Sequence, residues 1–507
     1  MKRLVVLRRI SQTLFLALFV YILWSTTHPL KGALPPGTFF KIDPLVMIVT
    51  AVSERVILGG MLVSFLMLIV TAVIGRFFCG WICPLGATMD LIRSSWKKRA
   101  MENDIINNKR KSIKFFLLGM IIFASFFGVQ TAWALDPMVL MARFVSLNLI
   151  PAVTSALNLL FMLLVRDLGM YGPVQDVYRA LKGSILGINV YYFAHSWVIL
   201  AFFLGVCALT LLSSRFWCRS ICPLGAIYAL AGRYSSLRRT VKDCNRCGRC
   251  RNSCRMGAIR GDNSYSQGEC ILCMDCVYDC HLHSTAFRWG GRSGCKLPDG
   301  RQVSTNSGIT RRQFIMLTAS SAGLLGFKFP WDKTAPRSAI IRPPAALKEG
   351  EFINRCIRCG NCMKVCVTNG LQPVMLEAGI DGIWTPQLVP EIGYCEYQCT
   401  LCGNTCPTGA IPPLSIERKK KVKLGLAVID RETCLPYIKG TECIVCEEHC
   451  PVPNKAIKLV MEAGAGGAFV AKPVIDKELC VGCAICQTKC PVRPRAVRVV
   501  DTGSDRT

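Results

Sequence analysis

The distribution of apolar residues divides the chain into two unlike parts. Before residue 218 the apolar residues form blocks long enough to cross a bilayer, whereas the rest of the chain is more polar and is punctuated by cysteine. Four blocks are predicted to be membrane-spanning helices: residues 10–24, 56–78, 115–135 and 197–217. The pattern therefore predicts a membrane protein with a soluble extension.

The basic residues around these blocks predict an orientation. Lys and Arg are concentrated at the N-terminus, in the loop of residues 93–114 and directly after residue 217. Because loops rich in Lys and Arg stay on the cytoplasmic side, all three segments are predicted to be cytoplasmic.

The membrane part contains an internal repeat. The segment RFFCGWICPLGA at Arg76 recurs as RFWCRSICPLGA at Arg215, and each copy ends a unit that contains an Asp-Pro step, at Asp43 and at Asp136. Two parallel copies require an even number of crossings between equivalent cysteines. The further apolar stretch 149–165 is therefore predicted to be a buried or re-entrant segment rather than a fifth span.

The repeat places four cysteines at one face of the membrane: Cys79, Cys83, Cys218 and Cys222. Cysteines four residues apart at a helix end share a face, so the two pairs are predicted to converge on one redox or metal site. The alternative is that these cysteines are small packing residues and that the following Pro and Gly residues form turns.

Composition and charge agree with a membrane location. The chain is 51% hydrophobic and 18% charged, with a formal net charge of +29. Much of the Lys and Arg flanks the apolar blocks, and clusters bound by cysteine would add negative charge that the formal count omits. Nucleic-acid binding is therefore not expected.

Directly after the membrane part come two motifs of the form Cys-x2-Cys-x2-Cys-x3-Cys. In such motifs three thiolates hold one 4Fe–4S cluster and the fourth reaches the neighbouring cluster. One cluster is thus assigned to Cys244, Cys247, Cys250 and Cys280, and the other to Cys270, Cys273, Cys276 and Cys254. Zinc would favour two Cys-x2-Cys pairs with a long gap, and no Cys-x-x-Cys-His haem motif occurs. Arg255 and His281 replace the usual proline after the fourth cysteine, and His281 and His283 are not expected to be ligands.

Residues 284–309 have the composition of a linker, and residues 310–330 have the form of an internal twin-arginine signal with Arg311 and Arg312. A signal of this type exports a folded domain with its clusters already in place. The C-terminal part, residues 350–500, is therefore predicted to be periplasmic.

That C-terminal part holds four more cysteine motifs, which predict four further 4Fe–4S clusters. The motifs are Cys356, Cys359, Cys362, Cys366; Cys395, Cys399, Cys402, Cys406; Cys434, Cys443, Cys446, Cys450; and Cys480, Cys483, Cys486, Cys490. The spacing does not determine how these motifs pair. No nucleotide-binding fingerprint occurs, so the domain is predicted to conduct electrons without chemistry of its own.

These motifs resemble two known families. Residues 1 to about 290 resemble the NapH/MauN-type membrane ferredoxins, through four spans, twin Cys-x3-Cys-Pro motifs and two cytoplasmic cluster motifs. Residues from about 308 onward resemble the exported NapG/MauM-type four-cluster ferredoxins. The resemblance implies a fusion of both, in which quinol is oxidised and electrons reach a periplasmic reductase or redox partner. An accessory role in metalloenzyme maturation, such as copper-site assembly, is the alternative.

The predicted fold class is an α-helical polytopic membrane domain, residues 1–240, with small α+β ferredoxin domains of the bacterial type at residues 241–283 and 350–500. The predicted partners are the lipid bilayer, the quinone pool and a periplasmic redox partner. Quinol oxidation needs proton acceptors, and the candidates by position are Asp43, Glu54, Asp136 and His195. Each of these residues could instead be a helix cap or an interfacial polar residue.

Overall fold

A computed structural model describes residues 2–27, 30, 34–56, 59–95, 109–167, 172–182, 191–242, 244–245, 247–259, 265–290, 340–463 and 469–501. The chain forms two compact units. The first comprises Met1–Ile22, Gly37–Phe144 and Trp197–Phe329, and the second comprises Leu23–Pro36, Val145–Ser196 and Pro330–Thr507. The linker and the predicted signal, residues 284–309 and 310–330, lie almost wholly outside the described residues.

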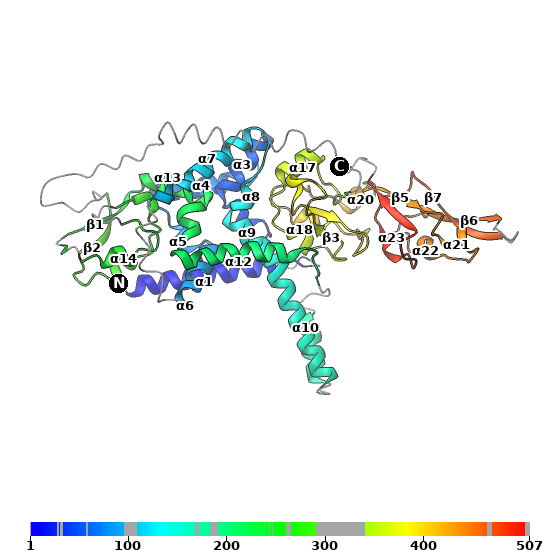
Figure 1. The fold of residues 1–507 in the computed structure, drawn as a ribbon, viewed down its shortest axis with the longest axis horizontal. Coiled ribbons are helices and arrows are strands. Elements are labelled where there is room, and N and C mark those ends of the chain that lie inside the picture. The colour runs from blue at the N-terminus through cyan, green and yellow to red at the C-terminus, as the bar shows by residue number, and fades with distance from the viewer. Residues whose placement is uncertain are drawn as a thin grey trace. The chain divides into compact units, whose positions relative to one another are not determined.

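The first unit is mainly helical (Figure 1). Its helices and turns are α1 (Lys2–Trp24), α2 (Thr38–Lys41), α3 (Pro44–Glu54), α4 (Met61–Ile74), α5 (Phe78–Trp81), α6 (Pro84–Ser95), η1 (Lys109–Ser112), α7 (Ile113–Phe126), α8 (Ala132–Leu135), α9 (Pro137–Phe144), α12 (Ser196–Leu212), η4 (Trp217–Ile221), α13 (Pro223–Ala231), η5 (Gly232–Tyr234), α14 (Arg249–Asn252), η6 (Gln267–Glu269) and α15 (Asp275–Tyr278).

The two Asp-Pro steps are helix starts. Asp43 precedes α3, and its Oδ1 accepts hydrogen bonds from the backbone N–H groups of Leu45 (2.9 Å) and Val46 (3.3 Å). Asp136 does the same for α9, with Met138 (2.8 Å) and Val139 (3.0 Å) as donors. Aspartate is a preferred N-cap and proline is favoured at the first helical position, so both residue types are explained locally.

The duplicated units pack around one another in this part of the chain. Helix α13 of the second copy lies against α3 and α4 of the first, and α6 of the first copy lies against α9 of the second. The contact is apolar at its centre, where Phe78 and Tyr228 meet with ring centroids 5.2 Å apart and both side chains fully buried. The core of the unit therefore lies between the two copies of the repeat.

The predicted spans agree with the structure only in part. Two helical stretches are long and apolar enough to cross a membrane, Arg3–Trp24 and Pro137–Arg166, which is weak evidence by itself. The blocks at 56–78, 115–135 and 197–217 contain the shorter apolar helices α4, α7 and α12.

The expectation that residues 149–165 are buried is wrong. These residues form most of α10 (Ile150–Arg166), and α9, η2 (Val145–Leu149) and α10 together make up the second long apolar stretch. Within α10 the buried residues are Ile150, Pro151 and Thr154, and large side chains such as Leu159 and Met162 are exposed. The four cysteines of the repeat lie together, as an even number of crossings requires, so the re-entrant alternative for this segment stays a prediction.

A two-stranded ribbon encloses the first pair of cysteine motifs. Strand β1 (Leu237–Val241) pairs antiparallel with β2 (Thr285–Trp289), in the register Leu237↔Trp289 to Val241↔Thr285. The chain between these strands carries all eight cysteines of the two motifs. The ribbon therefore joins the two ends of a small ferredoxin-like insert.

The second unit contains the C-terminal motifs. Its helices and turns, in addition to η2 and α10, are α11 (Pro173–Leu181), α17 (Glu349–Arg355), α18 (Asn361–Lys364), η9 (Ile380–Gly382), α19 (Leu401–Asn404), α20 (Ile416–Lys419), α21 (Leu435–Ile438), α22 (Val445–Glu448) and α23 (Ile485–Lys489). Its strands are β3 (Leu371–Pro373), β4 (Pro386–Leu388), β5 (Leu426–Ile429), β6 (Ile457–Ala463), β7 (Phe469–Ile475) and β8 (Val497–Val500), paired antiparallel as β3–β4, β5–β8 and β6–β7.

The strand pairs enclose the motifs as in the first unit. Strands β5 and β8 join the ends of the segment that carries the third and fourth C-terminal motifs. The segments that flank the first two C-terminal motifs meet without a strand pair. The backbone N–H of Leu347 donates to the carbonyl of Ala410 (3.2 Å), and Ala345, Ala346 and Ile411 pack around this contact. The cysteine motifs thus occur in three pairs, each closed by its own flanking segments.

Candidate iron–sulfur sites

In the ferredoxin-like insert, the cysteines of the two motifs surround two cavities. One cavity is lined by Cys244, Cys247, Cys250 and Cys280, and the other by Cys254, Cys270, Cys273 and Cys276. In each, three cysteines come from one motif and the fourth from the other. These are the same two groups of four that the spacing indicates.

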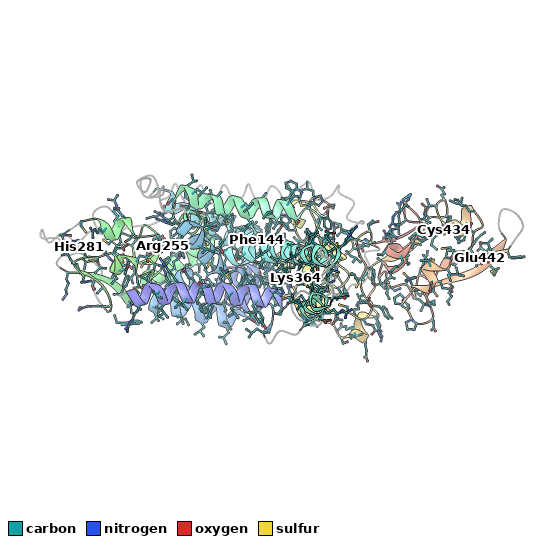
Figure 2. The ribbon with its side chains drawn as sticks, turned by 90° about the horizontal axis from the view of Figure 1, so that it is seen from below. Phe144, Arg255, His281, Lys364, Cys434 and Glu442 are labelled. Atoms are coloured by element: carbon teal, nitrogen blue, oxygen red, sulfur yellow. The ribbon has the colours of Figure 1, made fainter. Side chains whose placement is uncertain are left out.

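Backbone amides point at the sulfur atoms of this insert. The N–H of Ala258 donates to Cys254 Sγ (3.2 Å), and the N–H of Leu272 donates to Cys270 Sγ (3.4 Å). Such bonds stabilise negative charge on sulfur and tune the potential of a bound cluster. The His281 Nδ1 atom lies 3.9 Å from Cys247 Sγ, in the cavity wall and exposed to solvent (Figure 2).

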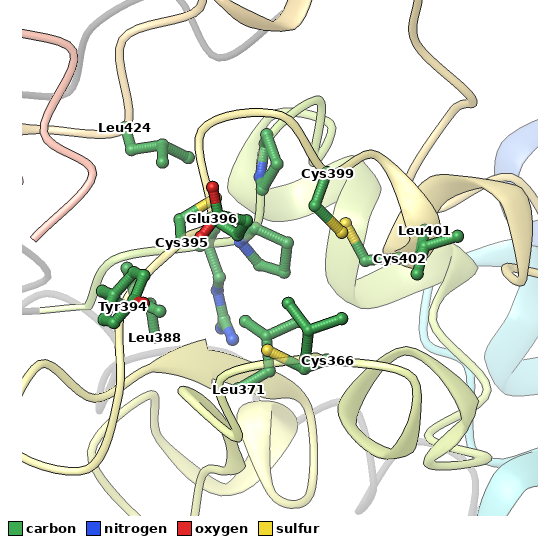
Figure 3. Close-up of a pocket in the computed structure, with 14 residues that line it drawn as sticks. Cys366, Leu371, Leu388, Tyr394, Cys395, Glu396, Cys399, Leu401, Cys402 and Leu424 are labelled. Carbon is green, nitrogen blue, oxygen red and sulfur yellow. The ribbon is translucent and has the colours of Figure 1, made fainter. Parts of the chain in front are cut away.

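In the second unit, the first two C-terminal motifs exchange their fourth cysteines in the same way. Cys356, Cys359, Cys362 and Cys406 line one cavity, and Cys395, Cys399, Cys402 and Cys366 line the next. Figure 3 shows the sulfur atoms of Cys366, Cys399 and Cys402 directed into the same space. The pairing that the spacing left open is therefore visible in the fold.

The third and fourth C-terminal motifs form another exchanged pair. Cys434, Cys443, Cys446 and Cys490 line a cavity. The remaining cysteines of these motifs lie within electrostatic range of one another, since Cys483 interacts with both Cys480 and Cys450, and Cys486 interacts with Cys483 and Cys480. Four groups of four cysteines therefore occupy this unit.

The two exchanged pairs of the second unit are in direct contact. The backbone N–H of Cys395 donates to the carbonyl of Cys483 (2.9 Å), and the N–H of Leu424 donates to the carbonyl of Val481 (2.9 Å). The group that contains Cys395 is therefore next to the group that contains Cys483. The four groups follow one another in a line that begins at Cys356 and ends at Cys434.

The Cys356 end of this line is attached to the apolar segments of the same unit. The buried Lys364 ammonium donates to the carbonyls of Leu23 (2.6 Å), Trp24 (3.1 Å) and Thr26 (2.8 Å) at the end of α1 (Figure 2). A Cβ on Gly360 would lie 3.0 Å from the side chain of Leu147. Positive charge at a helix C-terminus is favourable, so Lys364 holds the cysteine group that contains Cys356 against the end of α1.

The twin cysteines of the repeat also lie together. Cys79, Cys83, Cys218 and Cys222 are all buried, and each of Cys83, Cys218 and Cys222 is within electrostatic range of Cys79. Cys218 lies in η4, a π-helical turn, and such turns are frequent at functional sites. We refer to these four residues as the four-cysteine centre.

Two buried arginines connect the two copies of the repeat, each by a hydrogen bond to the other copy. Arg76 donates to the carbonyl of Cys218 (3.3 Å), and its counterpart Arg215 donates to the carbonyl of Cys79 (2.6 Å). Arg76 Nε also lies 3.2 Å from Cys79 Sγ. The arginine that opens each copy of the motif thus contacts the cysteine of the other copy, as a pseudo-twofold arrangement requires.

Carboxylates from two further segments neutralise these arginines. Asp90 binds Arg215 (2.7 Å) and Arg255 (3.0 Å), and Glu269 binds Arg76 (3.4 Å). Burial opposes ionisation of Asp90, but Arg215 and Arg255 outweigh it and hold the pKa of Asp90 well below its usual value. Burial likewise disfavours the charged form of Glu269, yet Lys114 and Arg76 lower its pKa.

The four-cysteine centre adjoins the insert within the first unit. Gly80 follows Cys79, and a Cβ at that position would overlap the carbonyl of Ile271. Trp81 Nε1 donates to the carbonyl of Leu272 (3.1 Å), and Arg8 donates to the carbonyl of Cys273 (3.0 Å). The centre is therefore next to the cavity of Cys254, Cys270, Cys273 and Cys276.

Within the described ranges, no three His, Cys, Asp or Glu side chains are arranged so that they could hold a metal ion. The cavities fit a cluster better, because four thiols face one space and each ligand of a cubane binds a different iron atom. The donor set is thus that of an iron–sulfur cluster.

The predicted proton acceptors have different surroundings. Asp43 and Asp136 are fully buried and lie together in the first unit. Glu54 is half-buried at the end of α3, and His195 is exposed in the second unit. The reciprocal arginines and the buried Tyr228 were not predicted, although the recurrence of Arg three residues before each first cysteine could have indicated the former.

Comparison with known proteins agrees with both parts of this description. A family described as "4Fe-4S binding domain" matches residues 56–102 and 196–242, which hold the two copies of the Cys-x3-Cys motif. The methylamine utilization ferredoxin-type protein MauM of Methylorubrum extorquens is 32% identical over 196 residues, which are 37% of this chain and 82% of that protein. The ferredoxin-type protein NapG of Escherichia coli is 32% identical over 185 residues, 34% of this chain and 78% of that protein. The chain belongs to the MauM/NapG family of ferredoxin-type proteins.

The MauM/NapG-type region accounts for about a third of this chain. An uncharacterised protein of Methanocaldococcus jannaschii, MJ0750, is 26% identical over 298 residues, 57% of this chain and 98% of that protein. No solved structure matches. This MauM/NapG relative is therefore an iron–sulfur, ferredoxin-type electron-transfer protein with several 4Fe–4S sites.

Proposed function

We propose that the chain is a membrane-bound quinol-oxidising module that passes electrons through six 4Fe–4S clusters to a periplasmic redox partner. The observation that carries this proposal is the arrangement of the motif cysteines as three exchanged pairs, with the four groups of the second unit in a line. A line of one-electron carriers is suited to conduction. Its ligands are the motif cysteines named above.

The protein's own residues hold and insulate these groups. When bound, each cluster accepts or releases one electron. The cysteines fix its position, backbone N–H groups such as those of Ala258 and Ile411 point at the sulfurs, and buried apolar residues exclude water. Ala410 and Ala496 are buried and pack in the apolar clusters that contain Cys406 and Cys490.

The membrane location rests on the apolar helices and on the resemblance of the first part to NapH/MauN-type proteins. Helices α1, α4, α7 and α12, which lie in the four apolar blocks of the sequence, supply the spans. The twin-arginine sequence at Arg311 and Arg312 supports export of residues 350–500. We assign the four-cysteine centre as the redox or metal site that connects the membrane part to the insert.

The function is tested by adding quinol, without oxygen, to the full chain in lipid nanodiscs. We expect electron paramagnetic resonance signals of reduced clusters in the wild type. Cys83→Ser together with Cys222→Ser should abolish the signals with quinol, because the four-cysteine centre is lost. Dithionite should still reduce the clusters of that variant, which shows that it is folded and loaded.

The matched control is Cys207→Ser, since Cys207 is a buried cysteine of α12 outside every motif. It should be reduced by quinol as the wild type is. If quinol reduces neither the wild type nor the control while dithionite reduces both, the chain is not a quinol-oxidising module and an accessory role is favoured. Reduction of the double variant at the wild-type rate would exclude the four-cysteine centre from the route.

A further inference from the structure

Arg239 is a buried cation of the ferredoxin-like insert in the first unit. It lies at the centre of β1, where the alternation of a strand turns its side chain inward and the side chain of Arg238 outward. Arg239 is only 3% exposed. An arginine side chain keeps its charge in a protein, so β1 carries a permanent positive charge into the interior of the insert.

The guanidinium of Arg239 reaches both groups of cysteines in the insert, which we name by their first members, the Cys244 group and the Cys254 group. Its Nη2 donates to the Sγ of Cys250, a member of the Cys244 group (3.4 Å). The same side chain lines the cavity of the Cys254 group. Nη2 also donates to Thr285 Oγ1 on β2 (3.4 Å), which fixes the guanidinium at this place. Arg239 therefore lies between the two groups.

Carboxylates neutralise other buried arginines of this unit, but not Arg239. Arg8 is bound to Asp275 (3.2 Å). Arg215 is bound in the same way to Asp90 (2.7 Å). Arg239 forms no ion pair with a carboxylate in the part of the chain that the structure describes, and its Nε is buried there without a hydrogen-bond partner. Because a buried charge is costly without an opposite charge beside it, the compensating charge has to come from the cysteine groups that the guanidinium reaches.

Clusters held in the two groups supply a charge of the required sign. A 4Fe–4S cluster with four thiolate ligands is negatively charged, and reduction adds one more negative charge. A fixed cation beside the cluster stabilises its reduced form more than its oxidised form, and this raises the reduction potential. Since Arg239 reaches both groups, a single side chain acts on both potentials.

We propose that Arg239 is the shared counter-charge of the two clusters of the insert and raises the reduction potentials of both. It is a positioning residue and not a ligand, because its charge acts on clusters that the cysteines hold. This inference rests on the part of the proposed function that places two clusters in the insert. It does not depend on quinol or on the side of the membrane.

The test is a redox titration of the full chain, with chemical mediators in place of quinol and electron paramagnetic resonance as the readout. The signals of the insert are those that disappear when Cys244→Ala and Cys254→Ala are combined, since this variant changes both cavities. In Arg239→Gln the midpoint potentials of both insert clusters should fall, because the positive charge is removed. The potentials of the C-terminal clusters should stay the same.

The matched control is Arg238→Gln, on the outward side of the same strand, where the Nε of Arg238 donates to the carbonyl of Ser235 (3.3 Å). It should leave every potential unchanged. Arg239→Lys keeps a positive charge, so it should retain both insert clusters even if Arg239→Gln loses them.

Two results would overturn the proposal. The first is an Arg239→Gln chain that keeps all its iron and has the potentials of the wild type. The second is equal loss of insert iron from Arg239→Gln and Arg239→Lys, since the shape of the arginine and not its charge would then be needed. Both results are obtained without quinol, so they are distinct from a failure of quinol to reduce the chain, which would contradict the proposed function alone.

Discussion

At the scale of single residues, the first unit depends on buried charges that are paired. Arg76 and Arg215 are among its most deeply buried side chains, and each reaches a backbone carbonyl of the opposite repeat as well as a carboxylate. Removing one partner from such a pair is costly, since it leaves the other charge buried without compensation. The carboxylates are therefore as important to the four-cysteine centre as the arginines.

Asp90→Asn should lower stability in a pH-dependent manner. The pKa of Asp90 is depressed in the folded protein, so its contribution is complete above the unfolded value of about 4 and is lost as the pH falls below it. We expect the variant to lose about 3–5 kcal/mol at pH 7, because Arg215 and Arg255 lose their shared partner. The difference in unfolding free energy from the wild type should narrow between pH 4 and pH 3, as measured by chemical denaturation in detergent. A difference in unfolding free energy that stays constant between pH 4 and pH 3 would contradict the role of Asp90 as the ionised partner of Arg215 and Arg255.

Gly225→Ala should disturb the contact between the repeats. A Cβ at Gly225 would overlap Arg76 Nη2, and that arginine is held in place by Cys79, Cys218 and Glu269. Overpacking of this kind costs about 1–3 kcal/mol. The matched control is Gly205→Ala on α12, where a Cβ meets nothing within 4 Å and alanine should stabilise the helix by up to about 1 kcal/mol. The unfolding temperatures of the two variants make the comparison. If Gly225→Ala and Gly205→Ala unfold at the same temperature, the close approach of Gly225 to Arg76 does not contribute to stability.

At the scale of elements, each cluster site is built from two motifs. The first three cysteines of a motif lie in and shortly before a short helical turn such as α14 or α15, and the fourth lines the neighbouring cavity. The sequence is sufficient to predict this exchange in the insert, where the spacing is regular. It is not sufficient in the C-terminal part, because the choice of partner motif depends on contacts such as Leu347 with Ala410 and β5 with β8, which are remote in sequence.

Iron content can distinguish exchanged from unexchanged pairing. Cys244→Ala with Cys280→Ala changes one cavity and should remove about four iron atoms per chain, whereas Cys244→Ala with Cys254→Ala changes two cavities and should remove about eight. The two double variants have equal numbers of substitutions, so each controls for the other, and Cys207→Ala should retain all the iron.

The same comparison applies in the second unit. Cys356→Ala with Cys406→Ala is expected to cost one cluster, and Cys356→Ala with Cys366→Ala two. If the pairs within one motif lost one cluster and the pairs within one cavity lost two, the exchange would be wrong.

Element starts were more predictable than element ends. Asp-Pro specifies the start of α3 and of α9 through a cap and a fixed φ, both of which are local. The spans were less predictable, because hydropathy does not locate the breaks at Gly75 and Leu212 that end α4 and α12. For residues 149–165, the apolar pattern was consistent with a helix, but it did not show that most of the side chains of this helix would be unburied.

At the scale of the whole molecule, the chain combines a duplicated apolar part with two sets of cysteine motifs. Cysteine spacing is sufficient to predict every ligand set of the insert, since these ligands are close in sequence. The recurrence of Asp43 as Asp136 and of Arg76 as Arg215 is visible in the sequence. The contacts that these residues make across the duplication were not predicted, since they join residues about ninety or more positions apart. In the proposed function, electrons move in one direction, from quinol in the membrane to a redox partner on the outer side.

That direction depends on the side of the membrane on which residues 350–500 lie, and protease access to a tag placed after Thr507 measures it most directly. In spheroplasts the tag should be cleaved in the wild type and protected when Arg311 and Arg312 are both replaced by Lys. The tag should be cleaved in both after the membrane is permeabilised, which shows that the protease site is intact. Protection in intact spheroplasts of the wild type would place all six clusters in the cytoplasm and would contradict an outward, quinol-oxidising route.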